Sequence, residues 1–208
     1  MLKTPDFGQI ISSVMDNFSK DDCDGALPYL LLTSKSESIV RDLLAFRLHK
    51  QFRGKNYAVA REWIRTDIAV LAPVLVGKTK QFKAPKAIIE IKMVAAPGKE
   101  NKNIHKHLEK LQCQLRDRKD KWPNAECFGL FVVRVFREAS LNSTSAFNKK
   151  FIKSKRESLS ANPSFHRSVD ARAKELNLRQ VNQKCLACGE DKIFKARVNL
   201  ELWLYSLR

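Results

Sequence analysis

The order of helix-like and strand-like patterns is the feature that most constrains how this chain can fold. A helical pattern begins at Ser36, with Ser34 or Ser36 as its cap, and ends near Gly54. The expected elements then continue as strands at 57–63, 65–71 and 87–93, a helix at 101–119, a strand at 126–136, a helix at 163–177 and a strand at 196–207. This order predicts an α/β (mixed α+β) fold with a central mixed β-sheet flanked by helices.

The length of 208 residues suits one domain spanning 1–208. We expect its core at about 36–136, and we expect 137–208 to form a basic region of helix and loop with a closing strand. Residues 72–86 include two prolines and a lysine-rich run, so they predict a connection longer than a tight hairpin loop.

The charge balance is strongly basic, because 39 Lys and Arg stand against 22 Asp and Glu, a net charge of +17. This excess favours a polyanionic partner, first nucleic acid and second an acidic membrane surface, although a basic surface kept for solubility is an alternative. The lysine-rich segments 77–86 and 148–156 are the best candidates for phosphate contacts, or else are solvated loops. Their candidate residues are Lys78, Lys80, Lys83, Lys86, Lys149, Lys150, Lys153, Lys155 and Arg156.

Membrane insertion and secretion are not expected. No apolar run approaches the eighteen or so residues that span a bilayer, and the start, MLKTPDFGQI, lacks the apolar region of a secretion signal. Five cysteines without framework spacing suit a reducing compartment, so a cytoplasmic (intracellular) location is expected. Cys185 and Cys188 form either half of a zinc site or a turn with two free thiols.

Two of the expected strands carry charged residues where apolar ones would be ordinary. Glu90 and Lys92 fall on one face of strand 87–93, and Asp67 lies in the middle of strand 65–71. If these strands are neighbours, the two carboxylates converge on one face. Two close carboxylates need a cation or a shared proton, and their oxygens suit Mg²⁺. The alternative is a solvent-facing set of charges in which Glu90 pairs across the sheet with a Lys or Arg.

Asp67 followed after 22 residues by Glu90-Ile91-Lys92 resembles the PD-(D/E)XK nuclease superfamily, over roughly residues 36–136. The resemblance implies a restriction-endonuclease-like core and an Mg²⁺-dependent (or Mn²⁺-dependent) endonuclease that hydrolyses DNA. The arrangement RTDIAVL … KAIIEIK is especially similar to the amino-terminal nuclease region of type I restriction subunits, although Thr66 stands where many members have proline.

The resemblance also implies residue roles. Asp67, Glu90 and the Ile91 carbonyl would bind the metal, with Glu37 as a further candidate ligand, and Lys92 would position the attacking water. Gln112 or Gln114 would support the site from the helix. The expected partner is double-stranded DNA, and a homodimer is compatible with the family. The alternatives are a structure-specific or RNA-directed nuclease of the same fold, and a catalytically inactive nucleic-acid-binding subunit.

The helix at 101–119 also carries His105 and His107 on its polar face, beside the apolar positions Ile104 and Leu108. These histidines are either solvated or in contact with phosphate.

Overall fold

The computed structural model of the chain describes residues 5–18, 26–33, 36–76, 79–95, 102–138, 163–191 and 196–207. The helices are α1 (Phe7–Asp16), α2 (Ala26–Thr33), α3 (Ser36–Phe52), α4 (Lys102–Lys121) and α6 (Pro163–Glu175). The strands are β1 (Ala58–Trp63), β2 (Thr66–Val76), β3 (Thr79–Ala95), β4 (Glu126–Glu138), β5 (Leu178–Asp191) and β6 (Ala196–Leu207). None of the helices in this described part of the chain is long and apolar enough to cross a membrane.

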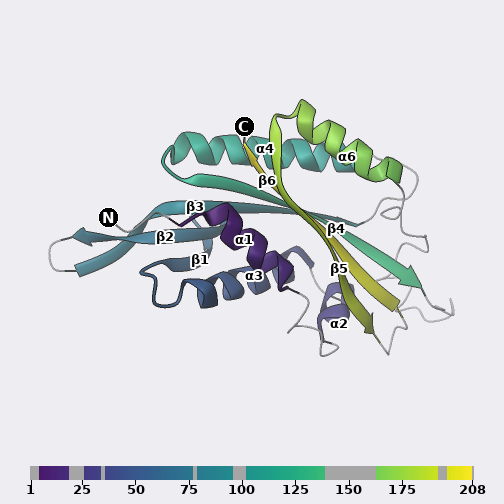
Figure 1. Cartoon of the computed structure of the whole chain (residues 1–208), viewed down its shortest axis with the longest axis horizontal. Helices are drawn as coiled ribbons and strands as arrows, with labels where there is room; N and C mark the ends of the chain where they lie inside the picture. The colour runs from purple at the N-terminus through teal and green to yellow at the C-terminus, as the bar shows by residue number, and fades with distance from the viewer. Residues whose placement is uncertain are drawn as a thin grey trace.

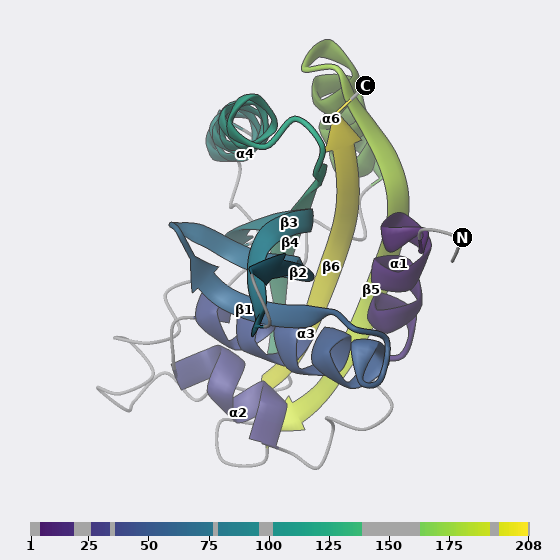
Figure 2. The ribbon, with the colours of Figure 1, turned by 90° about the vertical axis from the view of Figure 1, so that its left-hand side faces the viewer.

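The six strands form one mixed sheet with helices on both faces, which confirms the expected mixed α/β class (Figure 1). The strand order is β1-β2-β3-β4-β6-β5, in which β3 and β4 are parallel and the other neighbours are antiparallel. Helix α4 is the crossover that a parallel β3–β4 pair requires. The sheet is strongly twisted, so that β1 and β2 run across the direction of β5 and β6 (Figure 2).

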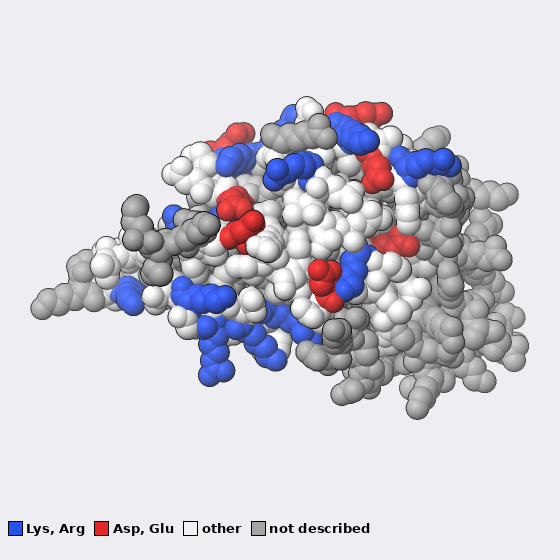
Figure 3. Space-filling model, in the orientation of Figure 1, with Lys and Arg blue, Asp and Glu red and all other residues white. Residues whose placement is uncertain are grey.

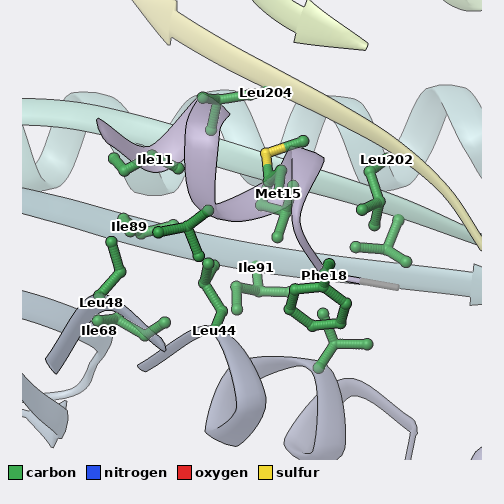
Figure 4. Packing of buried hydrophobic residues seen from close by; sticks show 14 of the residues in the cluster. Ile11, Met15, Phe18, Leu44, Leu48, Ile68, Ile89, Ile91, Leu202 and Leu204 are labelled. Atoms are coloured by element: carbon green, nitrogen blue, oxygen red, sulfur yellow. The ribbon is translucent and has the colours of Figure 1, made fainter. Parts of the chain in front are cut away.

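The first face of the sheet is covered by α1, α2 and α3. Ile11 and Met15 of α1 and Leu44 of α3 pack there against the sheet (Figure 4). The sheet supplies the other wall of this core with Ile68, Ile89, Ile91, Leu202 and Leu204, all at most 1% exposed. Burial of these strand residues removes apolar surface from water and holds β2, β3 and β6 in place.

The second face is covered by α4 and α6. The apolar stripe expected on α4 is confirmed, because Ile104, Leu108, Leu111 and Leu115 are all buried. Gly129 of β4 lets α4 approach closely, since a Cβ at this position would lie only 2.9 Å from the Leu111 side chain. Gly129 pairs in register with Glu90, so the same close approach places α4 directly over the charged part of β3.

The expectation of a long connection at 72–86 is wrong. Strand β2 extends to Val76 and β3 begins at Thr79, and Leu75 pairs with Lys80. The apolar run Val74–Val76 favours strand, and register shifts on either side of Leu71 and Ala72 accommodate the ladder beside the two prolines. We call residues 72–76 and 79–86 the β2–β3 arm; it projects from the body of the molecule (Figure 1).

The expectation of a turn at Cys185 and Cys188 is also wrong, because both lie in β5, where Cys185 is exposed and Cys188 is buried. Strand β5 was not anticipated, because it is a polar strand at the edge of the sheet that, among the described strands, pairs only with β6. Its sequence, LRQVNQKCLACGED, lacks the sustained apolar alternation that marks a half-buried strand.

Candidate active site

The site is built on the pairing of β2 with β3, which confirms that strands 65–71 and 87–93 are neighbours. The two strands are antiparallel, with Ile68 opposite Ile89. Side chains alternate along each strand, so the next residues, Asp67 and Glu90, lie on the other face from Ile68 and Ile89. That face is the one covered by α4.

Two carboxylates hold the backbone of β3 where its ladder with β2 ends. Oδ2 of Asp67 accepts a hydrogen bond from the Ile91 N–H at 2.8 Å. Oε2 of Glu37, from α3, accepts one from the Met93 N–H at 3.2 Å. The ladder stops at Ile89, so these amide groups need other partners, and the carboxylates supply them. They fix the backbone on both sides of Lys92.

Glu90 is a nearly inaccessible carboxylate, with 1% of its surface exposed. Its Oε1 accepts a hydrogen bond from Nε of Arg118 at 2.5 Å. The pKa of Glu90 is raised to about 7, chiefly by burial and in smaller part by the negative charge of Asp67, and Arg118 and Lys92 oppose this rise. The solvent-facing alternative is therefore wrong for Glu90, although it does pair with an Arg.

Arg118 also joins the site to the turn between β1 and β2. Its Nη2 donates to the Arg65 carbonyl at 2.5 Å. That turn holds Ile64 at a φ of +48° and Arg65 at +64°, a backbone region that β-branched residues rarely adopt. Trp63 packs against Trp122, with ring centroids 5.2 Å apart. These contacts clamp the β1–β2 turn onto the end of α4, beside Glu90.

Lys92 lies between the two tied amide groups. Its Nζ donates to the carbonyl of Ile91 at 3.1 Å, so it contacts the backbone oxygen that the family resemblance assigns to the metal. Lys92 also lines a hollow of about 480 Å³ beside α4, together with Lys106, Glu109, Lys110, Cys113 and Gln114.

The two candidate glutamines have different surroundings. Gln114 lines the hollow with Lys92. Gln112 is buried, and its Nε2 donates instead to the Leu176 carbonyl, at the junction of α6 and β5, at 3.3 Å. The structure therefore brings Gln114, and not Gln112, to Lys92.

The oxygen atoms at this site fit a hard cation. Asp67 and Glu90 supply carboxylates and Ile91 a carbonyl, the donors that Mg²⁺ prefers. A cation would also relieve the repulsion by which Asp67 raises the pKa of Glu90. Arg118 already pairs with Oε1 of Glu90, so a metal ion would have to share this carboxylate with Arg118 or displace it. No group of three or more His, Cys, Asp and Glu side chains in the described ranges is arranged as a metal site.

The candidate phosphate contacts are placed only in part. Lys80, Lys83 and Lys86 are exposed on the β2–β3 arm. Lys and Arg also gather below the arm, over the region of α3, on the face seen in Figure 3. The other candidates lie outside the described residues: Lys78, Lys149, Lys150, Lys153, Lys155 and Arg156.

Comparison with known proteins does not extend the assignment: no family model matches the chain, and no curated protein or solved structure is significantly similar to it.

Sequence reasoning did not find Arg118. It lies 28 residues beyond Glu90, in the last turn of α4, among several other basic residues. The available signal was physical, since a carboxylate on a strand covered by a helix needs a cation from that helix.

Proposed function

We propose that the chain is a Mg²⁺-dependent endonuclease of the PD-(D/E)XK type that hydrolyses phosphodiester bonds in DNA. The observation that carries the proposal is the pairing of β2 with β3, which sets Asp67 and Glu90 on one face with Lys92 two residues further along. The order helix, three antiparallel strands, crossover helix and parallel strand, from α3 to β4, supports a restriction-endonuclease-like core.

In this proposal each side chain has a separate task. Asp67, Glu90 and the Ile91 carbonyl would hold the metal ion, which would supply a lower pKa for a bound water and positive charge beside the phosphate. Lys92 holds the attacking water and places a positive charge beside the developing phosphate charge. Glu37 keeps the backbone of Met93 fixed, so Lys92 projects from a rigid strand.

The β2–β3 arm supports a duplex as the substrate. A two-stranded β-ribbon fits the major groove of B-DNA, and the exposed Lys80, Lys83 and Lys86 would contact phosphates along its length. The arm continues the same two strands that carry Asp67 and Glu90. Its contacts would therefore orient the duplex relative to the catalytic residues.

One observation favours a second candidate, a catalytically inactive nucleic-acid-binding subunit. Glu90 already has a cation in Arg118, so the buried carboxylate does not require a metal to be stable. In this alternative Arg118 is a permanent structural partner and the basic surface alone is functional.

The test is incubation of the purified protein with plasmid, linear duplex, branched DNA and RNA, in Mg²⁺, Mn²⁺ or EDTA. We expect cutting of duplex DNA with either metal and none in EDTA. Cutting in EDTA would contradict the assigned site, and preferential cutting of branched DNA or RNA would favour the other nuclease classes. Calorimetry that detects no binding of Mg²⁺ or Mn²⁺ to the folded protein would favour the inactive subunit.

A further inference from the structure

A hollow lies beside Lys92, and the chemistry proposed above gives this hollow no role. Helix α4 forms most of its wall with Lys106, Lys110, Cys113 and Gln114. Positions 106, 110, 113 and 114 follow helical spacing, so these side chains share one face of α4. Lys92 of β3 completes the wall on the side of the candidate active site.

The charge in this hollow is strongly positive. Lys92, Lys106 and Lys110 line it against one carboxylate, Glu109, and Arg172 of α6 already pairs with that carboxylate. Ammonium groups held together repel one another, so the arrangement is stabilised by an anion.

His107 reports the same concentration of charge. Burial lowers the pKa of His107, and the positive charges of Lys110, Lys92 and Lys106 lower it further, against the opposing charge of Glu37. The lysines of the hollow therefore act together on one neighbouring side chain, whose pKa they lower.

Two polar atoms near the hollow are buried and have no hydrogen-bond partner among the described residues. One is the side-chain oxygen of Gln114, which lines the hollow, and the other is Nδ1 of His107. Buried polar atoms are normally hydrogen-bonded, so Gln114, a wall residue of the hollow, has hydrogen-bonding capacity that no described residue uses.

We propose that this hollow binds one nucleotide unit of a polynucleotide strand, with its phosphate on Lys106 and Lys110. The inference rests on the proposed function, because it makes the occupant the nucleotide next to the phosphodiester bond cut at Lys92. The hollow has a volume of about 480 Å³, which lies in the range of ligand pockets. This volume is larger than a single phosphate needs. Lys92 then belongs to both sites and links the bound phosphate to the one that is cleaved.

Charge removal tests the proposal. Lys106→Gln, Lys110→Gln and the double variant are compared with Arg116→Gln, which removes an exposed charge from α4 outside the hollow. Binding of a fluorescent DNA oligonucleotide is measured in EDTA over a range of salt concentrations. We expect each lysine variant to lose about tenfold in affinity, and the salt dependence of log K to fall by about one unit per lysine. Arg116→Gln is expected to bind as the wild type does.

Accessibility of the exposed Cys113 provides an independent measurement, because this thiol lies in the wall of the hollow. Alkylation of Cys113 is followed by peptide mass spectrometry with the oligonucleotide, with an abasic oligonucleotide, with inorganic phosphate and with polyglutamate. We expect the oligonucleotide to protect Cys113 most strongly, the abasic strand less, and inorganic phosphate and polyglutamate little. Equal protection by polyglutamate, or by inorganic phosphate, would overturn the proposal of a nucleotide unit.

Other outcomes separate this inference from the proposed function. Binding and protection are measured without cleavage, so a protein that binds at the hollow but does not cut overturns only the nuclease proposal. A protein that cuts DNA while Lys106→Gln and Lys110→Gln behave like Arg116→Gln overturns only this inference. Circular dichroism and thermal unfolding verify that each variant is folded.

Discussion

The two ends of the β2–β3 pair depart from ordinary burial in opposite directions: one end buries a charged side chain, and the other exposes large apolar side chains. At the inner end Glu90, a charged residue, is 1% exposed. At the outer end, on the β2–β3 arm, Leu75 is 72% exposed and Phe82 is 41% exposed. Both ends belong to the same two strands, and the antiparallel ladder between them runs from the arm to Ile89, next to Glu90.

The difference lies in what covers each end. The inner end lies beneath α4, with the β1–β2 turn clamped beside it by Arg118 and Trp122. The arm extends beyond the helices (Figure 1). Buried charges and exposed large apolar side chains are the informative departures from a normal protein surface. One strand pair therefore carries a buried polar end and an exposed end with large apolar side chains, and what covers each end decides the difference.

The largest expected effect is at the inner end. Glu90→Gln keeps the shape of the side chain and removes the charge of a proposed metal ligand, so we expect DNA cleavage to fall by about a thousandfold or more. Glu126→Gln, which changes an exposed carboxylate at the start of the neighbouring β4, is the matched control and should cut normally. Rates of plasmid nicking in Mg²⁺ measure both. Full activity in Glu90→Gln would remove the inner end from catalysis.

Apolar substitutions should separate the two ends by stability. Ile89 at the inner end is fully buried, so Ile89→Ala leaves a cavity where its side chain packed. We expect this variant to lower the free energy of unfolding by about 2–5 kcal/mol. Leu75→Ser on the arm changes an exposed side chain and is expected to alter it by less than about 0.5 kcal/mol. Urea denaturation measures both values. A large loss in Leu75→Ser would show that the arm is covered in solution, for instance by a second copy of the chain.

The protonation of Glu90 gives a pH-dependent effect. Its pKa of about 7 in the folded protein lies above the ordinary 4.5, so the folded protein keeps this proton after the unfolded chain has released it. Rising pH between these values therefore favours unfolding, by up to about 3 kcal/mol at the upper end. The stability of the wild type relative to Glu90→Gln, measured in EDTA, should fall from pH 5 to pH 8. A constant difference would mean that Arg118 keeps Glu90 ionised throughout.

The smallest expected effect is at the outer end, where single charges act through solvent. Any one of Lys80→Gln, Lys83→Gln and Lys86→Gln is expected to weaken duplex binding by a few fold and to lower the salt dependence of log K by about one unit. Fluorescence anisotropy with a duplex probe in EDTA measures this. Unchanged binding in all three variants would exclude the arm from the DNA interface.

Much of the fold was predictable, because long elements with a clear apolar periodicity can be recognised from the sequence. The stripe of α4 follows the helical repeat, and the alternating strand β6 was expected at 196–207, where the structure has it at Ala196–Leu207. The pairing of strands 65–71 and 87–93 was a condition of the predicted site rather than a prediction, because residue type and periodicity do not say which strands are neighbours; the structure supplies it. The β2–β3 arm and β5 were not predictable from the sequence. The arm contains prolines and β5 is polar, so neither has the apolar alternation that marks a half-buried strand.

The sequence by itself determined the order of the elements from α3 to β4, the apolar stripe of α4, and the identity of the carboxylates on β2 and β3. These depend on local periodicity and on residue type, which any reader of the chain can follow. Only the tertiary structure decided that Glu90 is buried, that Arg118 is its partner and that Lys106 and Lys110 line one hollow with Lys92. Burial and charge proximity depend on which elements cover one another, and Gly129, by admitting α4 close to the sheet, sets that cover at the site.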